Sequence, residues 1–142
     1  MKKFREYLEE QDSKILSSLV NQDQKERTEY QDFVEKNANN DYQRGATLWA
    51  KLKNRPADDV FGDKERFSRF KSTKFDHSKF SKKDWHNYWL ISQHADHDRD
   101  FQKQALSTIE QHLGRDNDMF KYLSDRIEMA EKGTQTYGTQ NN

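Results

Sequence analysis

The chain of 142 residues contains no cysteine, one proline and five glycines. Without cysteine it can form no disulfide and offers no thiolate as a nucleophile or metal ligand, which fits a reducing compartment. Proline and glycine are the residues that most often end helices, so their scarcity favours long helices with few tight turns. The sequence therefore predicts an all-α fold.

Net charge and long apolar runs are also missing. The 25 basic residues balance 25 acidic ones, which removes the electrostatic argument for a general nucleic-acid binder. No apolar run approaches the roughly 20 residues of a membrane-spanning helix. Met1-Lys2-Lys3 is followed by no hydrophobic signal core. We expect a soluble, cytoplasmic protein without membrane partners.

Aromatic residues are plentiful: nine Phe, six Tyr and three Trp can fill a core beneath a heavily charged surface. We predict a single domain over residues 1–142, built as a compact irregular bundle of four to six helices. Its parts are an N-terminal helical segment (1–36), an irregular Phe/Lys-rich segment (56–83), a three-helix region (84–133) and an ordered tail (134–142) folded back over the bundle.

The Phe/Lys-rich segment allows two interpretations. Aromatic side chains interleaved with basic ones over residues 64–83 can stack on single-stranded nucleic acid. Alternatively, its phenylalanines pin an irregular stretch to the core, which is the interpretation that we favour. Nucleic acid is accordingly not an expected partner.

In the N-terminal segment, Asp23 and Arg27 interrupt an apolar helical stripe. They are four residues apart on the face that carries Leu19, Tyr30 and Val34. This spacing permits an ion pair, and the apolar neighbours predict that the pair is partly buried.

The segment around His94 carries the candidate acid–base chemistry. His94 follows Leu90 by four residues and so lies on the inner face of a helix, whereas Asp96 would point away from that face. The two converge only if the helix breaks, and Asp98 as the cap of a following helix offers such a break. His94 and Asp96 are thus the candidate catalytic residues, with a histidine that satisfies its bonds in the core as the alternative.

Arg126 flanks the apolar stripe of the last helix, while Asp125 points away from it. A half-buried guanidinium requires a carboxylate partner, and we expect Asp23 or Asp98 to supply it from another helix. We predict neither a metal nor another cofactor. If a metal did bind, the spacing of His94, His97 and Asp98 would supply its ligands.

Taken together, the polar residues resemble the signature of an uncharacterised bacterial domain-of-unknown-function family. The matching pieces are Asp23-Gln24-x-x-Arg27, Gln93-His94-Ala95-Asp96, Leu123-x-Asp125-Arg126 and Gln135-x-Tyr137-Gly138-Thr139-Gln140. A Gly-Trp-Pro stretch that the family usually carries is replaced here by the Phe/Lys-rich segment. The resemblance brings no activity, but it implies one ligand-binding set: Asp23, Arg27, Gln93, Asp98, Gln102, Asp125, Arg126, Gln135, Tyr137, Thr139 and Gln140.

A weaker resemblance concerns the first ten residues. They are similar to the capsid-targeting peptides of large tailed phages, which place an aromatic residue, a Glu and an aliphatic residue before a Leu-x-Glu protease site. Leu8-Glu9-Glu10 fits that site, although Gln11 stands where a small residue is usual. The alternative is an ordinary amphipathic first helix turn. The resemblance implies the interior of a phage head as the alternative location.

Two functions follow as expectations. The first is a small-ligand-binding or hydrolytic site for a polar or anionic ligand, with His94 as base or hydrogen-bond donor, Arg126 for the anion and Asp23 and Asp98 orienting them. The tail residues Gln135, Tyr137 and Gln140 would close over that ligand. The alternative is a non-enzymatic interaction protein, phage-encoded and associated with the virion, in which the polar residues form a buried network that specifies helix packing.

Overall fold

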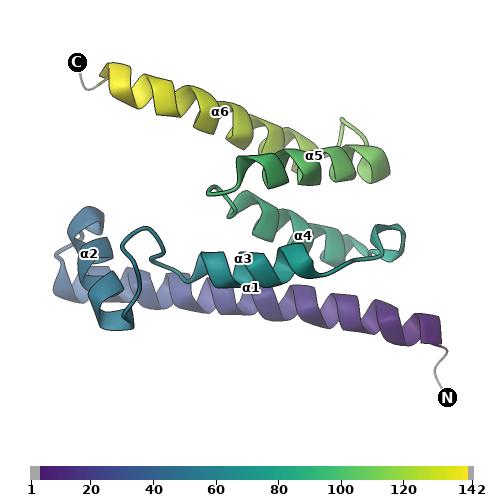
Figure 1. The fold of residues 1–142 in the computed structure, drawn as a ribbon, viewed down its shortest axis with the longest axis horizontal. Coiled ribbons are helices and arrows are strands. Elements are labelled where there is room, and N and C mark those ends of the chain that lie inside the picture. The colour runs from purple at the N-terminus through teal and green to yellow at the C-terminus, as the bar shows by residue number, and fades with distance from the viewer. Residues whose placement is uncertain (1–3, 141–142) are drawn as a thin grey trace. The chain divides into compact units, whose positions relative to one another are not determined.

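The structure, a computed structural model, describes the backbone of residues 4–140 and the side chains of residues 11–133. Within this range the chain is helical, with no strand, and the all-α prediction is confirmed (Figure 1). The α-helices are α1 (Phe4–Asn37), α2 (Tyr42–Lys53), α3 (Asp63–Ser72), α4 (Lys82–Gln93), α5 (Arg99–Leu113) and α6 (Asp118–Gln140), with a short 3-10 helix at His77–Lys79.

The helices form two compact units. One comprises residues 10–74 and is called here the α1–α3 unit. The other comprises residues 75–142 together with residues 1–9, and is called the α4–α6 unit. The prediction of a single domain stays a prediction, and each unit is described by itself.

In the α1–α3 unit, α1 is one uninterrupted helix whose stripe is buried as predicted. Leu19 and Val34 are fully buried, and Asp23 is only 3% exposed. Tyr30 packs edge-on against Trp49 of α2 with ring centroids 5.8 Å apart, which forms the aromatic centre of this unit's core. The Tyr30 hydroxyl donates to the carbonyl of Tyr42 at 2.8 Å, so its polar end is satisfied.

The segment 56–83 is more regular than the sequence suggests, because it contains α3. Phe67 and Phe70, three residues apart, are both buried on one face of this helix. Gly62 precedes the helix with φ +63°, a conformation that favours glycine. A Cβ there would also lie 2.6 Å from a nitrogen of the Arg55 guanidinium, so the glycine allows close approach. The prediction of an irregular stretch is therefore wrong for residues 63–72.

In the α4–α6 unit, consecutive helices run in opposite directions and each contacts the other two (Figure 1). Short turns join them, as is usual for antiparallel neighbours. Asp98 caps α5 by accepting from the Phe101 amide, as expected, and Gly114 ends this helix. Ser81 caps α4, and Asp84 at the third helical position completes a capping box with Ser81.

Helix α6 extends further than the sequence indicates. It continues through Gly133 and Gly138 to Gln140, because each glycine costs a helix only about 1 kcal/mol and does not by itself end it. Side chains after Gly133 lie outside the described residues. Within the part that is described, no helix is both long and apolar enough to cross a membrane.

Candidate functional site

The predicted pair of Asp23 and Arg27 belongs to a six-membered ionic network in the α1–α3 unit. Arg27 Nε donates to Asp23 Oδ1 at 2.9 Å, and its Nη2 donates to Asp63 Oδ2 at 3.1 Å. Arg66 Nη1 donates to Glu26 Oε2 at 2.8 Å and its Nη2 to Asp63 Oδ1 at 2.8 Å. The partly buried pair is thus confirmed, and it ties α1 to α3.

Arg66 is the centre of this network, since its side chain is only 12% exposed. Besides Glu26 and Asp63, it lies 3.5 Å from Asp23 and donates to the Phe61 carbonyl, while Arg55 also binds Glu26. Sequence reasoning found the four-residue pair but missed the residues of α3 and of the loop before it, because those contacts are 29 to 43 residues apart in sequence.

Burial raises the pKa of Asp63 within this network. The nearby charges of Arg27 and Arg66 pull in the other direction, but the Asp23 carboxylate adds to the effect of burial. The network holds three carboxylates against three guanidiniums, and each of the six binds at least one other member. Asp23 and Arg27 thus help to hold α1 against α3, and their role in orienting a ligand stays a prediction.

In the α4–α6 unit, Gln102 is fully buried and joins α5 to the end of α4. Its Nε2 lies 3.0 Å from the carbonyl oxygens of both Ser92 and Gln93 and 3.2 Å from Asp96 Oδ1. Arg99 donates to the Gln102 Oε1. The amide thus caps the last carbonyls of α4, which a helix end leaves without intrahelical donors. Gln102 is a structural residue of the turn.

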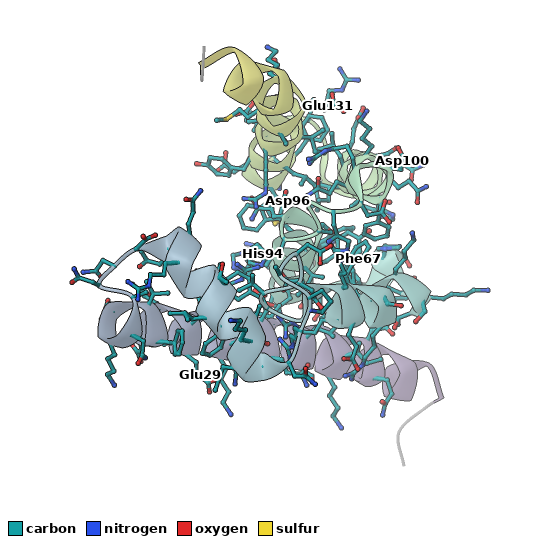
Figure 2. The ribbon with its side chains drawn as sticks, turned by 60° about the vertical axis from the view of Figure 1, so that its left-hand side comes forward. Glu29, Phe67, His94, Asp96, Asp100 and Glu131 are labelled. Carbon is teal, nitrogen blue, oxygen red and sulfur yellow. The ribbon has the colours of Figure 1, made fainter. Side chains whose placement is uncertain are left out.

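Asp96, labelled in Figure 2, lies in the turn between α4 and α5. It accepts two hydrogen bonds from Arg126 of α6. Arg126 Nε donates to Oδ1 at 3.1 Å and Nη2 to Oδ2 at 2.6 Å. The expected partners, Asp23 and Asp98, are wrong. The reason is that α4 ends at Gln93, so the chain leaves helical geometry and brings Asp96 back toward α6, while Asp98 is used as the cap of α5.

The carboxyl group of Asp96 has a lowered pKa. Burial acts against ionisation, but the hydrogen bond and charge of Arg126 outweigh it, with further help from Gln102 and Arg99. Because the folded-state pKa lies below the unfolded one, this group stabilises the fold above the unfolded pKa of about 3.9. That stabilisation is lost as the pH falls through the folded-state value.

We therefore expect the free energy of unfolding of Asp96→Asn to depend less on pH, at acid pH, than that of the native protein. The variant should lose stability at neutral pH, by about 1 kcal/mol or less because the pair is roughly half exposed. The difference from the native protein should then shrink as the pH is lowered. Urea unfolding at a series of acid pH values measures both quantities, and a difference that stays constant with pH would contradict the assignment.

His94 is half-buried and follows the last residue of α4, where its amide bonds back to the Leu90 carbonyl. The helix break that the sequence required for His94 and Asp96 to converge is present. Asp96, however, is engaged by Arg126 and Gln102. The catalytic roles of both residues stay predictions.

An open groove lies between α4 and α6 in this unit. It has a volume of about 610 Å³ and combines polar and apolar side chains. The large apolar ones on α6, Tyr122 and Met129, are 59% and 71% exposed. The Trp89 ring of α4 lies beside Tyr122 with centroids 6.4 Å apart. The groove is lined by Trp89, Gln93, Tyr122, Asp125, Arg126 and Met129, and is called here the α4–α6 groove.

The groove brings together only part of the predicted ligand-binding set. Gln93, Asp125 and Arg126 line it, while Asp23, Arg27, Asp98 and Gln102 do not. The apolar part of the lining, Trp89, Tyr122 and Met129, is not among the residues that the sequence predicts for a site. The seven-residue spacing of Tyr122 and Met129, with Asp125 and Arg126 between them, is the signal that could have marked a shared face.

The remaining predicted site residues are the possible metal ligands near His94 and the residues of the two termini. No group of three or more His, Cys, Asp or Glu side chains is arranged to hold a metal among the described residues, so His94, His97 and Asp98 do not form one. The tail residues Gln135, Tyr137, Thr139 and Gln140, and the phage-like N-terminal peptide, have side chains outside the described residues. Their roles stay predictions.

Comparison with known proteins gives no relative: no protein-family model matches the chain, and no curated protein or solved structure is significantly similar to it.

Proposed function

We propose that this protein is a non-enzymatic interaction protein that binds another polypeptide in the α4–α6 groove. The observation that supports this proposal is the exposure of Tyr122 and Met129 beside Trp89 and Arg126. Tyr, Trp, Met and Arg are the side chains enriched at protein interfaces, where they supply most of the binding energy. Gln93 and Asp125 add polar groups that can fix the orientation of a bound segment.

Several of the polar residues expected at a ligand-binding or hydrolytic site bind other residues of this chain. Asp23 and Arg27 belong to the ionic network, and Gln102 caps α4. Asp96, the candidate partner of His94, holds the guanidinium of Arg126 in place. This distribution favours the interpretation in which the polar residues specify helix packing, and it leaves the groove as the surface available for binding.

The proposal is tested by selecting displayed helical peptides on the full-length protein. Selected peptides should shift the indole N–H resonance of Trp89, which is the one tryptophan of three that lines the groove. Met129→Glu should weaken their binding at least tenfold, since it places a charge in an apolar contact worth about 1.4 kcal/mol or more.

Leu52→Glu is the matched control, because Leu52 is a similarly exposed apolar side chain (63%) on α2, outside the groove. It should leave peptide binding unchanged. Failure to enrich any peptide, or binding that is equally sensitive to both substitutions, would contradict the proposal.

A small anionic ligand is the second candidate for the same groove. It is favoured by the volume of about 610 Å³, which lies in the range of small-molecule pockets, and by Arg126 in the lining. Titration with inorganic phosphate separates the two candidates. A saturable shift of the Trp89 resonance that disappears in Arg126→Lys would support the anion, and an unchanged resonance would count against it.

A further inference from the structure

The groove face of α6 has the same spacing of apolar and charged positions in both directions, with the two charges exchanged. Tyr122, Asp125, Arg126 and Met129 are spaced by three, one and three residues, so they share one face of the helix. Read in the opposite direction, the same spacing recurs. An apolar residue stands at each end, and two opposite charges stand in the middle.

This palindromic spacing fixes a register for two antiparallel copies. If a twofold axis passes between positions 125 and 126, Asp125 of one copy lies opposite Arg126 of the other, and this ion pair occurs twice. The same axis places Tyr122 opposite Met129 of the second copy, about 5 Å along the helix on either side, because a helix rises about 1.5 Å per residue. In this register every charge faces an opposite charge and every apolar side chain faces an apolar one. The face is thus complementary to itself, as an isologous interface requires.

The charges on this face are available for such pairing. No hydrogen bond or ion pair engages Asp125 among the described residues, and its side chain is exposed. Arg126 donates to Asp96 through its Nε and Nη2 nitrogens. A guanidinium has five N–H donors, so the Nη1 nitrogen of Arg126 still has its two to offer a second carboxylate.

We infer that the polypeptide bound in the α4–α6 groove is α6 of a second copy of this chain, packed antiparallel about an axis between Asp125 and Arg126. This inference rests on the proposed function and names its partner. The described part of the contact, residues 118–133, is about 24 Å long. It has room for apolar contacts around two ion pairs.

The oligomeric state of the full-length protein tests the inference. Sedimentation velocity over a wide concentration range should show a rise from the mass of one chain toward that of two. Asp125→Arg should keep the chain monomeric at the highest concentration, because it sets like charges opposite each other at both positions. A monomer throughout, or a dimer that Asp125→Arg leaves intact, would overturn the inference.

A charge exchange makes the test specific to the register. Arg126→Asp should also be monomeric by itself, because the new carboxylate at position 126 would face Asp125 of the second copy. Mixed with Asp125→Arg, however, it should form a mixed dimer, because every facing pair again has opposite charges. If both variants are folded by circular dichroism and do not associate when mixed, the register is wrong.

Arg126→Asp also removes the partner of Asp96, so a second measurement guards against misfolding. The chain has no native cysteine, and a single introduced one therefore reports unambiguously. Tyr122→Cys mixed with Met129→Cys should give a disulfide between unlike chains under mild oxidation. Preferential linking of each variant to itself would overturn the antiparallel arrangement.

The outcomes also separate this inference from the proposed function. If the native chain is monomeric at every concentration but displayed peptides still bind in a Met129-dependent way, the groove is an interaction site for another polypeptide and only the second copy is rejected. If neither a second copy nor any peptide binds, both proposals fail.

Discussion

Replacing Arg66 with alanine is expected to lower the free energy of unfolding of the α1–α3 unit by about 3–5 kcal/mol, the usual cost of removing one partner from a buried ionic cluster. Arg66 is shared by Asp23, Glu26 and Asp63, and its side chain is 12% exposed. Without it, these carboxylates keep only part of their countercharge in a poorly hydrated place. Urea denaturation followed by far-ultraviolet circular dichroism measures the loss.

Arg115→Ala provides the control for this prediction. It removes a guanidinium that pairs with Glu110 at 2.9 Å, but there the side chains are 77% and 39% exposed. A surface pair of this kind contributes less than about 1 kcal/mol. Equal losses for the two variants would show that the network around Arg66 is not buried in solution.

A second substitution, Glu26→Gln, tests whether the effect of Arg66→Ala is electrostatic. Glu26→Gln removes one negative charge, so adding it to Arg66→Ala restores the balance of charges in the network. The double variant should be more stable than the sum of the single losses implies, with a coupling of about 0.5–3 kcal/mol. Strict additivity would indicate that Arg66 stabilises the unit through packing of its aliphatic stem alone.

The second large effect is expected from Gln102→Ala, at about 2–4 kcal/mol. This change leaves a void at a fully buried position and removes the donor that binds the carbonyls of Ser92 and Gln93. Gln102→Leu keeps most of the volume, so it should recover the packing contribution but not the hydrogen bonds. Thermal unfolding of the native protein and of both variants separates the two contributions.

Gln104→Ala is the matched control, because Gln104 lies on the exposed face of the same helix. It should change the stability by less than about 0.5 kcal/mol. Gln102 also donates to Asp96, so replacing Gln102 should weaken the interaction between Asp96 and Arg126. If Gln102→Leu were as stable as the native protein, the cap on α4 would contribute nothing to stability.

The parts of the fold that the sequence predicts are those determined by neighbours along the chain. The stripe from Leu16 to Val34 repeats over many turns, so its burial on α1 could be foreseen. The cap at Asp98 depends on local backbone geometry, and its prediction is also correct. Helix α3 was missed because Phe67 and Phe70 are its only large apolar residues among eight polar or charged ones.

The candidate site was less predictable because its geometry depends on chain reversal. The partner of Arg126 is decided by the turn after Gln93, which returns Asp96 to α6 across thirty residues. The helical periodicity of the sequence predicts that the helix continues through that turn. In a continuous helix, Asp96 would point away from the face that carries His94. The exposure of Tyr122 and Met129 depends on which side of α6 is covered by α4 and α5, and their residue types alone favour a place in the core.

The ionic network of the α1–α3 unit also bears on how the protein responds to salt. Three guanidiniums and three carboxylates leave these six groups without net charge. Because the pairs are buried or partly buried, added salt screens them much less than it screens exposed charges. The junction of α1 and α3 should keep its strength across the ionic strengths that a cell or a concentrated protein solution presents.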